Sequence, residues 1–154
     1  MKITFKSEHI IAELNGTTAF AVIDELVHHL ASIGTISPET KEAVAVAVKR
    51  RESSMSTGIG HGIAIPHAAT PLVAEAVIAF GRSVEGVEFD SLDRQPVRLI
   101  MLMIIPAARR EAHLPTLARI SRGLQRKETR DALQGAVDAE AIAGILNENS
   151  LVAV

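Results

Sequence analysis

The sequence has no cysteine, tryptophan or tyrosine, and only four phenylalanines among its 154 residues. Without cysteine it can form no disulfide framework and no thiolate site for catalysis or metal binding. A net charge of −2 and so few aromatic rings provide neither the basic footprint nor the stacking platform of a nucleic-acid-binding protein. We therefore expect no nucleic-acid partner, and a reducing, cytoplasmic location.

Long hydrophobic runs are also missing. The longest apolar run, LIMLMIIPAA at residues 99–108, is about half of a membrane span and contains a proline, so it reads as a buried strand. The N-terminal MKITFKSEHIIAEL lacks the apolar core and small-residue cleavage site of a secretory signal. We expect no membrane insertion and, at this length, a single domain over residues 1–154.

The first part of the chain has helical periodicity. Apolar residues at three- and four-residue spacing predict an amphipathic helix over residues 17–33, ended by Gly34. Ser37 as N-cap and Pro38 at the first helical position predict a second helix that reaches about Arg51. The short connection between them predicts an antiparallel helical hairpin.

The remainder of the chain alternates between strand and helix patterns. Strands are predicted at 76–84 and 96–107, the second apolar on both faces and therefore central in a covered sheet. Helical patterns follow from about Arg110 and about Glu128, and a last helix opens at Asp138, a plausible N-cap. This order predicts an α/β fold, a three-layer sandwich in which helices flank a central β-sheet on both faces.

The segment STGIGHGIAIPHAAT, residues 56–70, concentrates three of the ten glycines and two of the six histidines. We expect it in the loop before the main strands, with GIAI as at most a short strand. Glycines allow consecutive backbone N–H groups to converge on an anion. The candidate phosphate-binding residues are therefore Ser56, Thr57, Gly58, Gly60 and Gly62.

The segment does not match the familiar nucleotide-binding loops. It has no lysine for a Walker A loop, and Ile63 stands where a dinucleotide-binding fingerprint needs its third glycine. Zinc held by His61, His67 and His113 is a weak alternative, because His61 and His67 lack helical ligand spacing and the loop has no acidic residue. We predict no metal. A tight turn with two incidental surface histidines is the ordinary interpretation of a glycine-rich loop, but the residues that precede His67 argue against it.

His67 follows an alternation of apolar residues that ends in a proline. Ile63 and Ile65 predict a buried short strand, and the rigid Pro66 then holds the next side chain in a defined direction. Such an imidazole can act as a general base or as a nucleophile. With an unperturbed pKa of about 6.5 the ring is mostly neutral at cytoplasmic pH and can attack a phosphoryl group, whose oxygens nearby hydroxyl and N–H groups would hold.

The segment RRESSMSTGIGHGIAIPHA resembles the active-site segment of enzyme IIA of the phosphoenolpyruvate:sugar phosphotransferase system, in its fructose/mannitol class and nitrogen-regulatory branch. The likeness extends over the helical hairpin, the two strands and HLPTLARISRGL. It implies a mixed sheet flanked by helices, and a phosphoryl acceptor at His67. It also implies a phosphohistidine donor of the HPr or NPr type, and an active site that includes Arg51 and His113.

Elementary chemistry agrees with these two assignments. Arg51 offers a planar cationic fork for phosphate oxygens, although a solvated helix-end cation is the ordinary alternative. His113 is expected near a helix N-terminus, where N–H groups and the helix dipole favour an anion, although a histidine on an apolar helix face is commonly a core residue.

The expected function is that of a phosphotransferase component that carries a phosphoryl group on His67 and needs no cofactor. With no membrane-spanning or second phosphocarrier segment in the sequence, we expect the nitrogen-regulatory branch with regulatory target proteins. One alternative is a sugar-specific IIA that passes phosphate to a IIB subunit for fructose- or mannitol-type uptake. The others are a regulatory binding module that is not phosphorylated, and a hydrolytic metalloenzyme.

Overall fold

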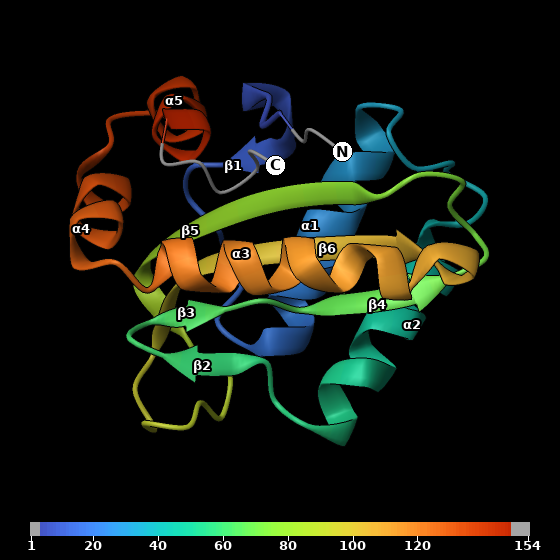
Figure 1. The fold of residues 1–154 in the computed structure, drawn as a ribbon, viewed down its shortest axis with the longest axis horizontal. Helices are drawn as coiled ribbons and strands as arrows, with labels where there is room; N and C mark the ends of the chain where they lie inside the picture. The colour runs from blue at the N-terminus through green and yellow to red at the C-terminus, as the bar shows by residue number, and fades with distance from the viewer. Residues whose placement is uncertain (1–3, 149–154) are drawn as a thin grey trace.

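The computed structural model describes residues 4–148 and is built around a mixed β-sheet (Figure 1). Its strands are β1 (Ile10–Ile11), β2 (Gly58–Gly60), β3 (Ile63–Ala64), β4 (His67–Thr70), β5 (Val77–Val87) and β6 (Val97–Pro106). The order is β1-β5-β6-β3-β2, and β4 also pairs with β6. The β5–β6 and β2–β3 pairs are antiparallel, whereas β1 runs parallel to β5, and β3 and β4 run parallel to β6. The mixed sheet implied by the family resemblance is confirmed.

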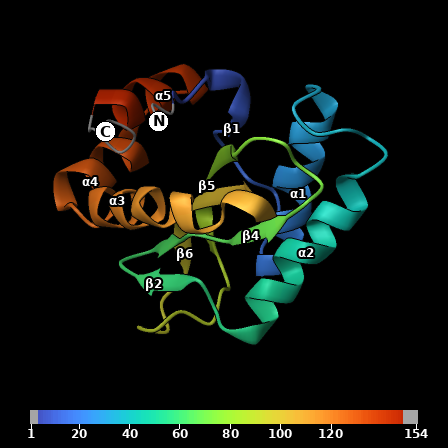
Figure 2. The same cartoon turned by 45° about the vertical axis from the view of Figure 1, so that its right-hand side comes forward.

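Helices cover both faces of this sheet, as predicted (Figure 2). One layer holds α1 (Ala19–Ser32) and α2 (Lys41–Ser54); the other holds α3 (Leu114–Leu124), α4 (Lys127–Gly135) and α5 (Ala139–Glu148). Short 3₁₀ turns precede β1 (η1, Ser7–His9) and α3 (η2, Ala107–Arg109; η3, Glu111–His113). All helices that the structure describes are too short or too polar to serve as membrane spans.

Strand β6 separates two apolar cores because successive side chains of a strand point to opposite faces. Leu99, Met101, Met103 and Ile105 pack into the core under α3, α4 and α5. Ile100, Leu102 and Ile104 pack into the core under α1 and α2. All seven side chains are buried, which explains why the strand is apolar on both faces.

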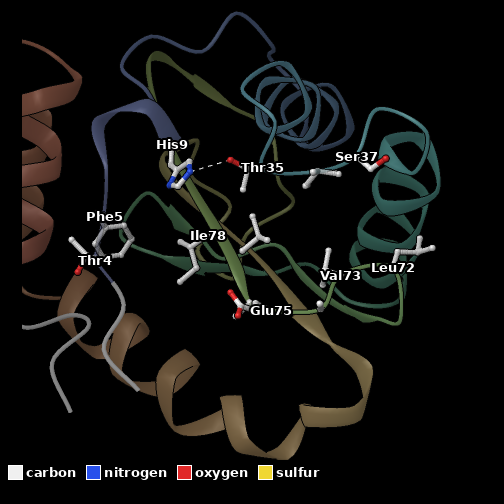
Figure 3. Close-up of a pocket in the computed structure, with 13 residues that line it drawn as sticks. Thr4, Phe5, His9, Thr35, Ser37, Leu72, Val73, Glu75 and Ile78 are labelled. Carbon is white, nitrogen blue, oxygen red and sulfur yellow. Dashed lines mark hydrogen bonds between the residues drawn. The ribbon is translucent and has the colours of Figure 1, made fainter.

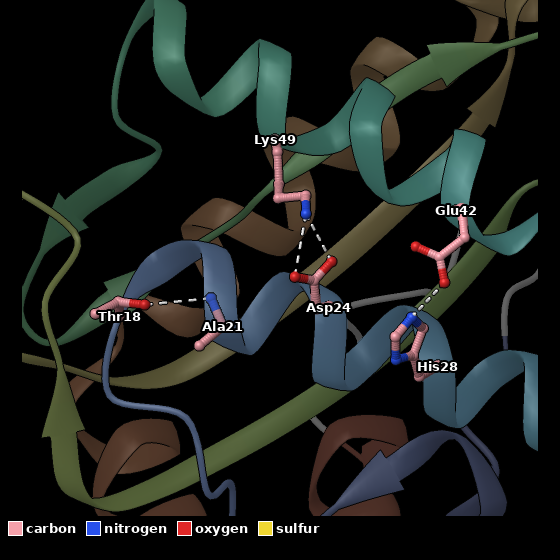
Figure 4. A network of polar contacts seen from close by, with 6 residues as sticks. All are labelled: Thr18, Ala21, Asp24, His28, Glu42 and Lys49. Atoms are coloured by element: carbon pink, nitrogen blue, oxygen red, sulfur yellow. Dashed lines mark hydrogen bonds and ion pairs between the residues drawn. The ribbon is translucent and has the colours of Figure 1, made fainter.

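Polar contacts join α1 to α2 on the outer side of the hairpin (Figure 4). Lys49 pairs with Asp24 at 2.9 Å, and the His28 ring contacts the Glu42 carboxylate at 3.0 Å. The Thr18 hydroxyl caps α1 by accepting the N–H of Ala21 at 3.2 Å. The first two contacts join α2 to α1 and so help to place the residues at the C-terminal end of α2.

Two of the predicted helix boundaries are confirmed and one is wrong. Gly34 follows α1 with a φ of +80°, and the Asp138 carboxylate accepts the N–H of Ala141 at 2.8 Å as the N-cap of α5. The predicted N-cap at Ser37 is wrong, because α2 begins at Lys41. Ser37 instead opens a turn in which its carbonyl accepts the N–H of Thr40 and its hydroxyl donates to Glu39.

Segment 56–70 is not a loop before the sheet but forms β2, β3 and β4 at the far side of β6. β3 and β4 follow the same edge of β6, with Ile63 opposite Leu99 and His67 opposite Met103. The carbonyl of Pro66 accepts the N–H of Met103 at 3.0 Å and continues the pairing between them. His67 is therefore the first residue of a strand that pairs with the almost completely buried strand β6.

Candidate functional site

The His67 ring is half-buried, and one of its nitrogens is held by the backbone. Nδ1 lies 2.8 Å from the carbonyl oxygen of Ile65. A carbonyl oxygen can only accept, so Nδ1 carries the proton. The other nitrogen, Nε2, is left with its lone pair. The intervening Pro66 restricts the backbone of this two-residue turn, so tautomer and ring orientation are set together.

The surroundings of His67 favour its neutral form. Burial lowers the pKa of the ring, while the hydrogen bond to Ile65 raises it. The charge of Arg51 lowers this pKa, that of Glu52 raises it and that of Arg110 lowers it. The net effect is a pKa below the ordinary value for histidine, so the ring is neutral and nucleophilic at neutral pH.

Two adjoining cavities meet at His67, where β4 runs between α2 and α3 (Figure 2). Both are lined by His67, Arg51, Leu114 and Leu117. The larger, of about 460 Å³, is also lined by Ala47, Arg50, Ser54, Ala68, Ala69, Ile105 and Arg110. The smaller, of about 350 Å³, adds Ser56, Thr57, Ile59, Ile65, Ala118 and Ser121. The histidine is thus accessible from a concave, partly apolar surface.

The larger cavity is positively charged. Arg51 lies in the last turn of α2, where Nη1 donates to the carbonyl of Met55 at 2.8 Å. Arg50 and Arg110 line the same cavity, and its lining contains no acidic side chain. Within residues 4–148 none of the three arginines pairs with a carboxylate. Unpaired guanidinium groups around a neutral imidazole suit an anionic group such as phosphate.

Ser56 and Thr57 line the smaller cavity, but their hydroxyl hydrogens are already donated. The Ser56 hydroxyl donates to the carbonyl of Phe89 and accepts the N–H of Gly58 at 3.1 Å. The Thr57 hydroxyl donates to Oε2 of Glu52 at 2.7 Å, and its N–H donates to Oε1 at 3.0 Å. In this conformation both residues shape the turn between α2 and β2.

The structure does not bring Gly58, Gly60 and Gly62 to His67, since none of them lines either cavity. A side chain at Gly58 would collide with Ser91. Gly60 and Gly62 have φ angles of +93° and +76° and form the turn between β2 and β3. In this structure the glycines form a tight turn and allow a close backbone approach. Their role in phosphate binding stays a prediction.

His113 ends η3 and is only 2% exposed. Its Nδ1 is buried without a hydrogen-bond partner among the described residues. Burial lowers the pKa of the ring, and the charge of Arg109 acts in the same direction. His113 lines neither cavity, although the next residue, Leu114, lines both. An unsatisfied buried ring nitrogen costs about 1–3 kcal/mol, which is commonly tolerated where it has a functional use.

Sequence reasoning missed Glu52, Arg50 and Arg110. A charged residue at a helix end is ordinarily solvated, so nothing in the local pattern marks Glu52 as buried. Arg110 reaches the site because β6 ends at Pro106 beside β4, a tertiary proximity that spacing does not reveal. The one available signal was the doubled arginine of RRE at the end of a predicted helix.

A separate cavity of about 470 Å³ lies where η1, the α1–α2 connection and the start of β5 meet (Figure 3). The His9 ring contacts the Thr35 hydroxyl there at 3.2 Å. This cavity shares no lining residue with the two at His67. Across residues 4–148, no group of three His, Asp or Glu side chains is placed to hold a metal ion.

Comparison with known proteins agrees with this fold. Residues 3–149 match the family model "Phosphoenolpyruvate-dependent sugar phosphotransferase system, EIIA 2". The chain is 43% identical over 128 residues to the fructose-specific EIIABC component of Bacillus subtilis, a match that covers 83% of this chain but only 20% of that protein. It is 31% identical to a nitrogen regulatory protein of Bradyrhizobium diazoefficiens, over 90% of this chain and 89% of the other.

A solved structure extends the likeness to three dimensions. The crystal structure of nitrogen regulatory protein IIA-Ntr from Neisseria meningitidis superimposes with a TM-score of 0.83 at 30% identity, over 92% of this chain and 94% of that one. The chain therefore belongs to the EIIA type 2 family of the phosphotransferase system, whose members are its phosphocarrier components.

Proposed function

We propose that the chain is a phosphocarrier in which Nε2 of His67 accepts a phosphoryl group from a phosphohistidine carrier protein of the HPr or NPr type. The observation that carries this proposal is the hydrogen bond from Nδ1 to the Ile65 carbonyl. It leaves the Nε2 lone pair available for attack, on a residue that lines two cavities and neighbours unpaired arginines.

The transfer is a nucleophilic displacement at phosphorus. The Nε2 lone pair forms the new P–N bond, while the donor's P–N bond breaks and its electron pair returns to the donor imidazole. Nδ1 keeps its proton and continues to donate it to the Ile65 carbonyl, so the transfer requires no proton movement. The phosphoramidate formed on His67 retains a reactive P–N bond. In a second displacement an acceptor nucleophile bonds to phosphorus while this P–N bond breaks and its electron pair returns to Nε2 of His67.

The surrounding residues stabilise the transferred group. Arg51 is proposed to hold phosphoryl oxygens with its guanidinium group, because phosphoryl transfer depends mainly on positioning and charge stabilisation. His113 is proposed to donate to the phosphate, and its unpartnered Nδ1 supports this role. Ser56, Thr57 and the three glycines stay candidate phosphate ligands only if their present hydrogen bonds rearrange.

We further propose that the relay is regulatory and cytoplasmic, where its phosphocarrier donors act. The match to a nitrogen regulatory protein over 90% of this chain and 89% of the other supports this assignment. A different observation, the 43% identity to a fructose-specific component, favours the second candidate, a sugar-specific IIA that phosphorylates a IIB subunit. Incubating the ³²P-labelled protein with a fructose-class IIB domain separates them, because only the second role requires rapid transfer.

Phosphorylation is tested by intact mass spectrometry after incubation with phosphoenolpyruvate, enzyme I and an HPr-type carrier. One acid-labile addition of about 80 Da is expected, mapped to His67. His67→Ala should remain unmodified, whereas the control His61→Ala, altered at an exposed turn residue, should be modified normally. Full modification of His67→Ala would refute the assignment.

A further inference from the structure

Glu52 is a buried carboxylate beside the candidate acceptor, only 7% exposed. Both of its oxygens accept hydrogen bonds from a single residue, Thr57, at 3.0 Å from the N–H and 2.7 Å from the hydroxyl. No ion pair neutralises Glu52 within residues 4–148. Buried carboxylates are ordinarily paired with a cation, because removing a charge from water is costly. In this structure the Glu52 carboxylate is held by the two hydrogen bonds from Thr57 instead.

The chemistry at His67 supplies a use for that charge. When Nε2 bonds to phosphorus while Nδ1 keeps its proton, both ring nitrogens are substituted and the ring acquires positive charge. Arg51 and Arg110 favour the negatively charged phosphoryl oxygens, but they disfavour a cationic ring. A fixed negative charge near the ring offsets that effect without occupying the cavity in which the phosphoryl group arrives.

The position of Glu52 suits this task. It directly follows Arg51 at the end of α2, so consecutive residues of one helical turn supply opposite charges. Thr57, its partner, lines the smaller cavity together with His67 and Arg51. The two hydrogen bonds therefore fix the carboxylate and the turn from α2 to β2 in one arrangement. The Thr57 carbonyl accepts the N–H of Ile65 at 3.2 Å, which ties this turn to the segment that leads into His67.

We propose that Glu52 is a positioning residue for His67: anchored by Thr57, it holds a fixed negative charge that stabilises the positive charge developing on the imidazole ring as Nε2 takes the phosphoryl group. This inference rests on the proposed phosphocarrier function and adds a residue to its site. The charged groups that face His67 support it, because Arg51 from α2 and Arg110 from the segment after β6 lower the pKa of His67, whereas Glu52 raises it.

Glu52→Gln tests the charge with little change in shape, since the amide can still accept from the Thr57 N–H and donate to its hydroxyl oxygen. The matched control is Glu111→Gln, which removes the same charge from an exposed residue next to Arg110. Histidine ring NMR of the unphosphorylated protein should show a lower His67 pKa in Glu52→Gln and an unchanged one in Glu111→Gln. Phosphorylation by the HPr-type carrier should slow on the order of tenfold to a hundredfold in Glu52→Gln alone.

Variants at Thr57 test the anchor. Thr57→Val keeps the carboxylate but removes the hydroxyl donor, so transfer should slow; Thr57→Ser keeps both hydrogen bonds and should restore the rate. These variants also test the proposed role of Glu52 if Glu52→Gln does not fold. Equal phosphoryl-transfer rates in Thr57→Val and wild type would then refute the role of the anchored carboxylate.

The outcomes separate the two proposals. A His67 pKa and a transfer rate that are both unchanged in folded Glu52→Gln overturn the inference while leaving the phosphocarrier function intact. Failure of the wild-type protein to take up phosphate at His67 overturns the phosphocarrier function, and with it the catalytic part of this inference. A shift of the His67 pKa in that case would still report the electrostatic contact.

Discussion

The two halves of segment 56–70 have different structural roles: the first forms a tight turn, and the second orients His67. In the glycine-rich half, residues 56–62, positive φ angles form a tight turn and Gly58 allows close contact with Ser91. In the following half, a short strand and Pro66 hold His67 so that Nδ1 donates to Ile65 and Nε2 is left with its lone pair. The comparison teaches that, in this conformation, the glycine-rich half determines backbone geometry, whereas the following half orients the candidate nucleophile.

Apart from His67 itself, Arg51 is the residue whose replacement should reduce the phosphorylation rate most, because it lies next to the half of the segment that bears His67. Arg51→Ala should slow phosphorylation by roughly one to three powers of ten, because it removes a guanidinium group that lines both cavities at His67. The melting temperature should fall only slightly, since the lost contact is one hydrogen bond to Met55. Stopped-flow or quench-flow transfer assays and thermal unfolding measure the two effects.

The control for Arg51 is Arg122→Ala, which removes an equal charge from an exposed position of α3. It should leave the transfer rate unchanged. Equal slowing in both variants would mean that overall charge, and not the position of Arg51, governs the rate.

For the glycine-rich half, residues 56–62, we expect the opposite: a substitution should lower stability and leave the phosphorylation rate nearly unchanged. Gly58→Ala should lower the free energy of unfolding by about 1–3 kcal/mol, because the added methyl group collides with Ser91 in a packed region. The folded variant should still be phosphorylated at nearly the wild-type rate. Chemical denaturation measures the first effect, and the phosphorylation assay measures the second.

Gly144 provides the matched glycine control, because it lies within α5 with open space around it. Gly144→Ala should be neutral or stabilising by up to about 1 kcal/mol, through helix propensity. If Gly58→Ala folds normally but loses phosphorylation, the glycine half does contact phosphate and the distinction between the two halves fails.

The smallest effect concerns pH. The pKa values of His9, His67 and His113 are lowered in the folded protein, mainly by burial in each case. The unfolded chain therefore binds protons more readily, and stability should fall as the pH drops below about 6.5, the ordinary histidine pKa. Urea midpoints at several pH values measure this loss.

Replacing His67 sharpens the pH measurement. His67→Gln should lose less stability between neutral and mildly acidic pH than the wild type does, because one of the three histidines no longer titrates. If the free energy of unfolding depended on pH in the same way in both proteins, burial would not be lowering the pKa of His67.

Local sequence signals determined much of the fold. The apolar pattern of β6 on both faces, the helical hairpin, Gly34 after α1 and the Asp138 cap of α5 follow from short-range physics, and the structure bears them out. The start of α2 was misjudged because Ser37 closes a turn with Thr40 and Glu39, an alternative that the same residue types support equally well.

Tertiary structure decided the surroundings of His67. Glu52, Arg110 and Leu114 come from α2 and from the segments after β6, and only the packing of helices on both faces of the sheet brings them to one strand end. Gly58 packs against Ser91, and its carbonyl accepts the N–H of Leu92 at 3.3 Å, so this end of the segment contacts the loop after β5. Local sequence sets the backbone conformation and the direction of a side chain. The electrostatic field and the cavity around that side chain depend on segments that are distant in the chain.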